Sequence, residues 1–391
     1  MNKVNISNEI FHWAIQRAGM TRESLAVSMH TKIANVIAWE EGRDFPSFQQ
    51  ALKMASLLGI PLGYLFLSNI PTITNPIADF RTIPGQDSTT LSLNLQEILD
   101  DTLRKRDWYR EWRQTESLPK LGFVGRYSVS RNIPEIIVDL RRELGIPENF
   151  TSRMTSWDEH LRSFVFHIES IGILVMQSGI VGNNTHKKLS LEEFRGFTIA
   201  DEYAPIIFIN AQDSIAARVF TLAHELAHIW TGTSGISNPE ISTDTTNQIQ
   251  LEQFCNKIAA EFLVPENLVE EQWNIRIGEV ENIQNLARYF RVSTQVILLR
   301  SIDRGYVKIS DYYTLYNELL KTIPVKTRKS GGDFYNSLVS RNSKRFTRSL
   351  LSALSGGQLS YLDAARLLNT QPSVVTKVIE NQSKGRVWNS V

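Results

Sequence analysis

The run His224-Glu225-Leu226-Ala227-His228 constrains this chain more than any other sequence feature. Residues four apart lie on one face of a helix, so two histidines at this spacing can bind one metal ion. Glu225 lies one step round the helix, where its carboxylate can act as a general base on a bound water. The predicted helix, residues 213–231, also has an apolar stripe, which consists of Val219, Phe220, Ala223, Leu226 and Trp230. We therefore expect this helix to pack on a layer of strands and to turn its histidines toward a cleft.

A catalytic zinc site also needs a third protein ligand and an open position for water. The next long predicted helix, residues 247–264, offers Glu252 and Glu261. At about 100° per residue, Glu252 shares a face with Cys255 and Asn256, whereas Glu261 points about 180° away. Glu252 is the better ligand, because a carboxylate on a core-facing helix needs a positive partner. A lysine or arginine is the alternative partner for Glu252, and Cys255 is either a packing residue or a soft metal ligand.

The composition predicts a soluble, globular protein of roughly two to four domains, since the chain has 391 residues. Its 42% hydrophobic and 21% charged residues are typical of packed cores and argue against disorder. No apolar run reaches the roughly 18 residues of a membrane span, and residues 1–9 lack the apolar core of a signal peptide. A single cysteine fits a reducing compartment. We expect a cytoplasmic protein that does not contact membranes.

Charge is distributed unevenly along the chain. Residues 67–320 carry 24 basic and 33 acidic side chains, whereas residues 321–391 carry 12 basic and 3 acidic ones. A basic tail of this kind attracts nucleic acid or an acidic protein surface, and it can equally be a solubilising surface.

The hydrophobic periodicity predicts a mainly α fold with a small α+β core. Residues 1–68 form an all-helical unit with short turns, and residues 69–120 form a connector that contains a helix. Residues 121–320 form the mixed core, and residues 321–391 form a basic helical extension. The predicted core elements are strands at 173–176, 194–199 and 206–210 and helices at 134–144, 157–170, 282–290 and 294–304.

Four segments resemble the ImmA/IrrE family of zinc metallopeptidases over about residues 121–311. They are, in order, Phe194-Arg195-Gly196-Phe197, the run from Ala204 to Asn210, the run from Phe220 to His228 and the run from Glu252 to Pro265. The resemblance implies a zincin-like core in which His224, His228 and Glu252 bind Zn²⁺ and Glu225 is the catalytic base. It departs from the family pattern only at Cys255 and Ile258, and neither departure removes a ligand.

Known members of that family cut a transcriptional repressor. The resemblance therefore implies a regulatory metallopeptidase whose substrate is a helix-turn-helix repressor or a similar protein. The alternative is a DNA-binding regulator, or an antitoxin-like protein that holds a toxin partner without cutting it. His186, in a polar loop, is either a substrate contact or a surface histidine.

The N-terminal unit resembles the lambda-repressor-like (XRE) helix-turn-helix family, which implies a five-helix bundle. The resemblance rests on Leu25-Ala26, Ile33, Val36, Trp39-Glu40-x-Gly42 and Pro46. It implies packing roles for Leu25, Ala26, Ile33, Val36 and Trp39, and base contacts by Thr31, Lys32, Asn35 and Ala38. The third helix has no arginine or glutamine, and residues 1–66 carry six basic against five acidic residues. Protein recognition or homodimer formation is therefore the rival role of this unit.

The tail contains a second candidate helix-turn-helix, formed by residues 359–368 and 373–380. Lys344, Arg345 and Arg348 lie on the helix before it. These side chains contact either nucleic acid or the acidic middle of the same chain, and the sequence leaves both alternatives open.

Overall fold

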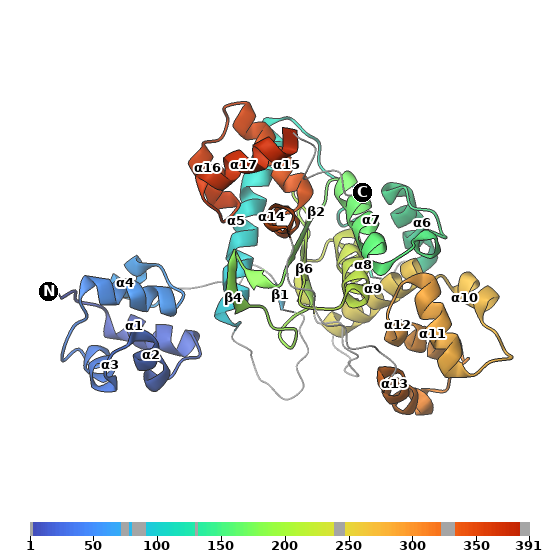
Figure 1. The fold of residues 1–391 in the computed structure, drawn as a ribbon, viewed down its shortest axis with the longest axis horizontal. Coiled ribbons are helices and arrows are strands. Elements are labelled where there is room, and N and C mark those ends of the chain that lie inside the picture. Colours follow the sequence, from blue (N-terminus) through green and yellow to red (C-terminus); the bar gives the residue numbers. More distant parts are fainter. Residues whose placement is uncertain are drawn as a thin grey trace. The chain divides into compact units, whose positions relative to one another are not determined.

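A computed structural model describes residues 3–71, 78–79, 91–129, 132–237, 247–321 and 333–383 (Figure 1). The described part is mostly helical with a small mixed sheet, as the periodicity predicted. It divides into two compact units, Met1–Pro76 with Ile83–Leu103, and Ile77–Thr82 with Arg104–Val391. Two parts of the predicted connector, residues 72–77 and 80–90, and the start of the predicted C-terminal extension at 322–332 lie outside the described residues. No helix within the described ranges has both the length and the apolar character needed to cross a bilayer.

The N-terminal unit contains helices α1 (Asn8–Arg17), α2 (Arg22–Met29), α3 (Ile33–Glu40) and α4 (Phe48–Leu57) and the 3-10 helix η1 (Leu62–Phe66). Serine or threonine hydroxyls cap α1, α2 and α4. Leu25, Ala26, Val36 and Trp39 are buried in its core, as expected. The expectation for Ile33 was wrong, because this first residue of α3 is 39% exposed.

The second unit is built on a five-stranded sheet with the order β1-β7-β5-β6-β2. Its strands are β1 (Ala78–Asp79), β2 (Leu174–Ser178), β5 (Gly196–Ile199), β6 (Ile206–Asn210) and β7 (Gly235–Ser237). β5 runs antiparallel to both of its neighbours, and β2 runs parallel to β6. Every residue of β6 is buried, which explains its continuous apolar sequence. A separate hairpin, β3 (Ile180–Val181) and β4 (Asn184–Lys188), follows β2.

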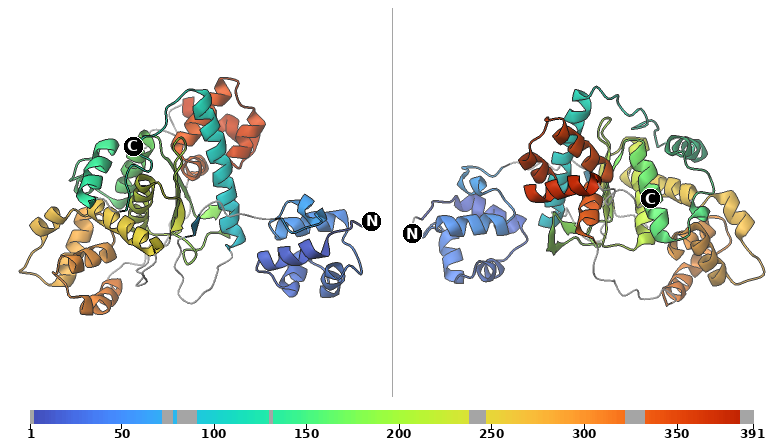
Figure 2. Two further views of the ribbon diagram at one scale, coloured as in Figure 1. Left: turned by 180° about the vertical axis from the view of Figure 1, so that it is seen from behind. Right: turned by 45° about the horizontal axis from the view of Figure 1, so that its top comes forward.

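Helices pack on this sheet, and Val175, Ile207 and Ile209 of its strands belong to a large apolar core that α6 (Ile133–Leu144), α7 (Trp157–Ser170), α8 (Ile215–Thr231) and α9 (Asn247–Leu263) share (Figures 1 and 2). α8 packs on β5, β6, α7 and α9, while α6 packs on α9. The 3-10 turn η2 (Thr151–Arg153) lies between α6 and α7. After the sheet follow α10 (Glu266–Gln272), α11 (Glu279–Phe290), α12 (Thr294–Asp303), the 3-10 turn η3 (Ile309–Asp311) and α13 (Tyr312–Lys321). The chain ends in α14 (Phe334–Asn342), α15 (Lys344–Ser355), α16 (Tyr361–Leu367) and α17 (Pro372–Ser383).

The first helices of the C-terminal extension pack against the same sheet. Both α14 and α15 contact β2. The Arg345 guanidinium donates to the backbone carbonyl of Glu169 at 2.8 Å and to the hydroxyl of Tyr109, on the long helix α5 (Leu93–Thr115), at 2.9 Å. Ser343 donates to the buried Glu169 carboxylate at 2.5 Å, and burial raises the pKa of that carboxyl. For Arg345, the choice that the sequence left open is settled in favour of contacts within the chain.

His160 is a buried histidine of α7 that makes the fold sensitive to acid. Its Nδ1 donates to the Arg291 carbonyl at 3.4 Å, and its Nε2 has no hydrogen-bond partner in the described structure. Burial lowers the pKa of His160 to about 4, from 6.5 in an exposed histidine. As the pH falls below 6.5, the unfolded chain therefore binds a proton before the folded chain does, and the free energy of unfolding decreases down to pH 4.

We expect His160→Phe to remove this part of the acid sensitivity. The ring lies against Phe150 and Phe164, so phenylalanine can fill the same space. The wild type should lose about 3 kcal/mol more than the variant between pH 7 and pH 4. Denaturant unfolding at several pH values measures the difference. Parallel pH profiles for the two proteins would show that His160 does not titrate in this way.

Candidate metal centre

The candidate metal ligands of α8 are buried at the middle of the fold. The hydroxyl of Ser214 caps the start of the helix, and Gly232 ends it with φ 68, a left-handed conformation that glycine adopts without strain. His224 and Glu225 are 0% exposed and His228 is 1% exposed. The apolar stripe of α8 faces the core as predicted, and Phe220 lies partly buried at its margin.

Glu252 of α9 lies directly opposite the two histidines. Its Oε2 is 3.1 Å from His224 Nε2, its Oε1 is 3.1 Å from His228 Nε2, and the two Nε2 atoms are themselves 3.1 Å apart. The structure thus brings together the three residues that the sequence selected as ligands, with all candidate ligand atoms within 4.8 Å of one another. Ligand atoms about 2.0–2.1 Å from a tetrahedral zinc lie about 3.3 Å from one another. The two histidine Nε2 atoms and a carboxylate oxygen of Glu252 are therefore spaced to bind one such ion.

The remaining ring nitrogens of the histidines are held by polar side chains. His224 Nδ1 donates to Asn256 Oδ1 at 2.9 Å, and His228 Nδ1 donates to Thr233 Oγ1 at 2.8 Å. With a proton on each Nδ1, both Nε2 atoms present lone pairs to each other and to the Glu252 carboxylate. Three acceptor atoms that converge in this way need a cation among them.

The pKa shifts of His224 and Glu252 indicate that the site favours a positive charge at its centre. Burial alone lowers the pKa of His224, but the adjacent Glu252 carboxylate outweighs it, so the pKa of His224 is raised. Burial by itself raises the pKa of Glu252. The two histidines together lower it by a larger amount, so the pKa of Glu252 lies well below that of a free carboxyl. The cluster therefore keeps its carboxylate ionised and favours a cation at its centre.

Glu225 is held beside the ligands by strand β5. Thr198 Oγ1 lies 2.7 Å from Glu225 Oε2, to which it donates, and 3.1 Å from the Glu225 carbonyl oxygen. Its other carboxylate oxygen, Oε1, is buried and has no hydrogen-bond partner in the described part of the chain. Burial raises the pKa of Glu225, while the electrostatic influence of His224 and His228 and the Thr198 hydrogen bond partly offset that rise. A carboxylate fixed through one oxygen and unpartnered at the other suits proton transfer.

Gly196 gives the Glu225 carboxylate its space. A Cβ atom at this position would lie 2.8 Å from Glu225 Oε1, 2.8 Å from Thr221 Cγ2 and 3.0 Å from the carbonyl oxygen of Phe208. These distances are shorter than van der Waals contacts, and the last involves backbone that cannot move freely. The absence of a side chain at this point of β5 is therefore a requirement of the site.

We expect Gly196→Ala to destabilise the fold by about 1–3 kcal/mol, because the added methyl group overpacks the strand–helix contact. Denaturant unfolding measures the loss. Gly122→Ala is the matched control, since a Cβ at Gly122 has no atom within 4 Å. Equal stabilities for the two variants would contradict this account of Gly196.

The other candidate residues lie away from these ligands. Glu261 pairs with Arg300, in agreement with its predicted position on the opposite side of α9. Cys255 is buried in the apolar core, where burial raises the pKa of its thiol, and it does not belong to the ligand group. His186 is exposed on β4.

The candidate DNA contacts belong to the N-terminal unit. Lys32 and Asn35 are exposed, Thr31 and Ala38 are half-buried, and Asn35 Nδ2 donates to Thr31 Oγ1 at 2.9 Å. Thr31, Lys32 and Asn35 lie at the start of α3 and Ala38 lies in its last turn. Base contacts by these residues stay a prediction.

Thr198, Thr233 and Asn256 are site residues whose roles the sequence did not reveal. Asn256 was placed on the Glu252 face of the helix, but without a partner. Thr198 belongs to β5 and Thr233 follows Gly232, so their roles depend on sheet register and on the turn after α8. The position of Thr233 directly after Gly232 was the one sequence feature that could have indicated a hydroxyl near His228.

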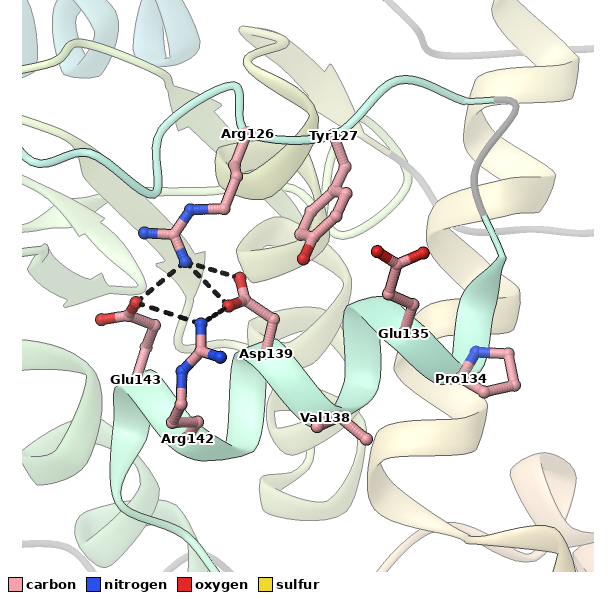
Figure 3. Close-up of a pocket in the computed structure, with 8 residues that line it drawn as sticks. All are labelled: Arg126, Tyr127, Pro134, Glu135, Val138, Asp139, Arg142 and Glu143. Atoms are coloured by element: carbon pink, nitrogen blue, oxygen red, sulfur yellow. Dashed lines mark hydrogen bonds and ion pairs between the residues drawn. The ribbon is translucent and has the colours of Figure 1, made fainter.

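An open groove of about 750 Å³ lies along α6 and contains no residue of the metal centre (Figure 3). Arg126 contacts both oxygens of Asp139 at 2.8 Å and Glu143 at 2.8 Å, and Arg142 pairs with Asp139. The Trp230 Nε1–H donates to Asp139 at 2.9 Å. The ion pairs of the groove therefore hold the loop before α6 against that helix, and the Trp230 hydrogen bond joins α6 to the end of α8.

Comparison with known families supports the interpretation of the core. Residues 168–301 match the peptidase M78 family model, described as the IrrE N-terminal-like domain. Residues 342–381 match a model of a domain of unknown function, DUF8813. No curated protein matches the chain significantly. Neither matched stretch includes residues 1–68, so the resemblance to lambda-repressor-like domains stays a prediction. The first match spans all three candidate ligands and Glu225, and it relates residues 168–301 of this chain to the ImmA/IrrE family.

Proposed function

We propose that this chain is a cytoplasmic zinc metallopeptidase with a regulatory protein substrate. The observation that carries the proposal is the convergence of His224, His228 and Glu252, with the unpartnered Glu225 carboxylate oxygen beside them. A site that only held a metal would have no need of Glu225. The match to a peptidase family over residues 168–301 supports the same conclusion.

In this proposal His224, His228 and Glu252 hold the zinc, and the chain's own groups move the proton. Zinc bound by three protein ligands supplies Lewis acidity and lowers the pKa of water at its open position to about 7. Glu225 accepts a proton from the attacking water and later delivers it to the leaving amine. Thr198 holds the opposite oxygen of the carboxylate throughout, so that the proton is carried by Oε1.

A helix-turn-helix repressor is the substrate class that we infer. Such repressors carry basic surfaces for DNA. Residues 67–320 of this chain, which include the metal centre, carry 33 acidic against 24 basic residues. Opposite net charges favour encounter between such an enzyme and its substrate.

The test first identifies the protein encoded by the adjacent gene, which the proposal expects to be a small helix-turn-helix repressor. The zinc-loaded protein should cut such a repressor at one bond, as seen by mass spectrometry of the fragments, and a chelator should stop the reaction. A neighbour that is instead a toxin, bound in a stable complex and left intact, would contradict the peptidase proposal and favour a holding role.

A further inference from the structure

The turn between α16 and α17 repeats the backbone of the helix-turn-helix between α2 and α3. In both, a hydroxyl caps the first helix, and the residue that leads into the turn is left-handed, with φ 55 at His30 and φ 52 at Asn369. The next residue is threonine in both cases, and its amide donates to the carbonyl five residues earlier. These bonds run from Thr31 to Ala26 at 3.0 Å and from Thr370 to Ala365 at 2.8 Å.

The buried positions of the two corners also correspond. At a constant separation in sequence, the inward residues are Leu25, Ala26, Met29, Val36 and Trp39 in the first corner and Ala364, Ala365, Leu368, Val375 and Val378 in the second. All ten are buried. The second corner therefore has the packing of a helix-turn-helix as well as its turn.

A third corner of the same kind, between α11 and α12, has a different environment. Arg291 is left-handed with φ 53, and the Val292 amide donates to the Ala287 carbonyl at 3.2 Å. However, Val296 and Leu298 of its second helix are buried in the apolar core, whereas the corresponding residues of the other two corners are exposed or half-buried. The second helix of the α11–α12 corner is therefore packed against the core on a face that the other two corners leave partly exposed.

The exposed residues at the start of α17 have the chemistry of a DNA reader. Gln371, Ser373, Thr376 and Lys377 are all exposed. Glutamine can pair with adenine, serine and threonine can bond to several bases, and lysine neutralises phosphate. The start of α3 exposes Lys32 and Asn35 together with the apolar Ile33 and Ala34.

The sequence around α17 is basic, since residues 321–391 carry 12 basic and 3 acidic residues. Within the described part, Arg348 is exposed on α15, and Arg366 is exposed on α16, where it also contacts Asp363. The turn itself is anchored by Arg104, which donates to the Asn369 side chain at 3.2 Å. Exposed cationic side chains beside a polar helix can contact the phosphate backbone of a duplex.

We propose that the α16–α17 corner, within the stretch that matches DUF8813, is a binding site for double-stranded DNA. The N-terminal end of α17 enters the major groove, Gln371 and Ser373 contact base edges, and Lys377 contacts phosphate. This site is separate from the metal centre and does not depend on the peptidase activity.

The test measures binding of the full-length chain to labelled duplexes of about 30 base pairs and random sequence, long enough for two half-sites, at several salt concentrations. Lys377→Ala should weaken binding about tenfold at low salt and lower the slope of log affinity against log salt by about one. Gln371→Ala should leave the salt slope unchanged and alter the sequences recovered by selection from the pool. Both residues are exposed, so these changes should leave the melting temperature as it is.

Lys308→Ala is the matched control, because Lys308 is an exposed lysine that lies outside both helix-turn-helix corners. Wild-type affinity in this variant supports the assignment to α17. Loss of binding in Lys32→Ala, with Lys377→Ala unaffected, would transfer the activity to the N-terminal unit and overturn the proposal. Absence of duplex binding by the wild type at low salt would also overturn it, and would leave α17 as a protein-binding surface.

Discussion

Glu225→Gln is expected to retain zinc and to lose peptide cleavage by about a thousandfold. Glutamine has the size of glutamate, and its amide oxygen can still accept the Thr198 hydrogen bond, so the site should keep its shape. The amide cannot take up a proton, however, and general-base catalysis contributes about 10²–10⁴ to such rates. Metal content by atomic spectrometry and single-turnover cleavage of the repressor substrate measure the two effects.

Glu270→Gln is the control for this change. Glu270 pairs with Arg304 at the surface of α10 and is half-exposed, so its replacement should leave cleavage and metal content unaltered. Undiminished cleavage by Glu225→Gln would remove Glu225 from the mechanism. Loss of zinc in that variant would instead give Glu225 a structural role at the metal centre.

Glu252→Ala is expected to weaken zinc binding at least about a hundredfold, because even residues that only support a metal ligand contribute up to about that factor. The wild-type chain should gain about 2.7 kcal/mol of stability when free zinc is a hundred times its dissociation constant. The same zinc concentration should stabilise the variant by much less. Denaturant unfolding with and without zinc gives both values.

Glu270→Ala again serves as the control and should keep the full zinc effect. An equal gain in stability for Glu252→Ala and the wild type would show that Glu252 is not a ligand. The metal would then have to be held without α9, and the proposed function would lose its main support.

The convergence of the three candidate ligands was predictable because it depends on local helix geometry. His224 and His228 are four residues apart on one helix, and the face of α9 that carries Glu252 follows from the period of its apolar neighbours. The sequence could not indicate Thr198 or Gly196 as neighbours of Glu225. Their contact depends on how β5 lies beneath α8, which is set by the register of the sheet.

Strands, too, could be predicted where the local sequence determines them and not where contacts distant in sequence do. β6 was predictable as a continuous apolar run that is buried on both faces. β7 was missed, because Gly235–Ser237 is short and has no alternation of its own, and it pairs with β5 through contacts that are distant in sequence. The contact of Arg345 with Tyr109 joins residues 236 positions apart, beyond the reach of any local pattern.

The attachment of α14 and α15 to β2, with Arg345 bonded to Glu169 and Tyr109, means that the extension cannot swing independently of the metal centre. Removing residues 333–391 would expose strand β2 where α14 and α15 cover it. It would also leave the buried carboxylate of Glu169 without the hydrogen bond from Ser343. If α17 binds a duplex, the metal centre is held at a fixed distance from that duplex. Peptide cleavage would then be limited to proteins bound to nearby stretches of the same DNA.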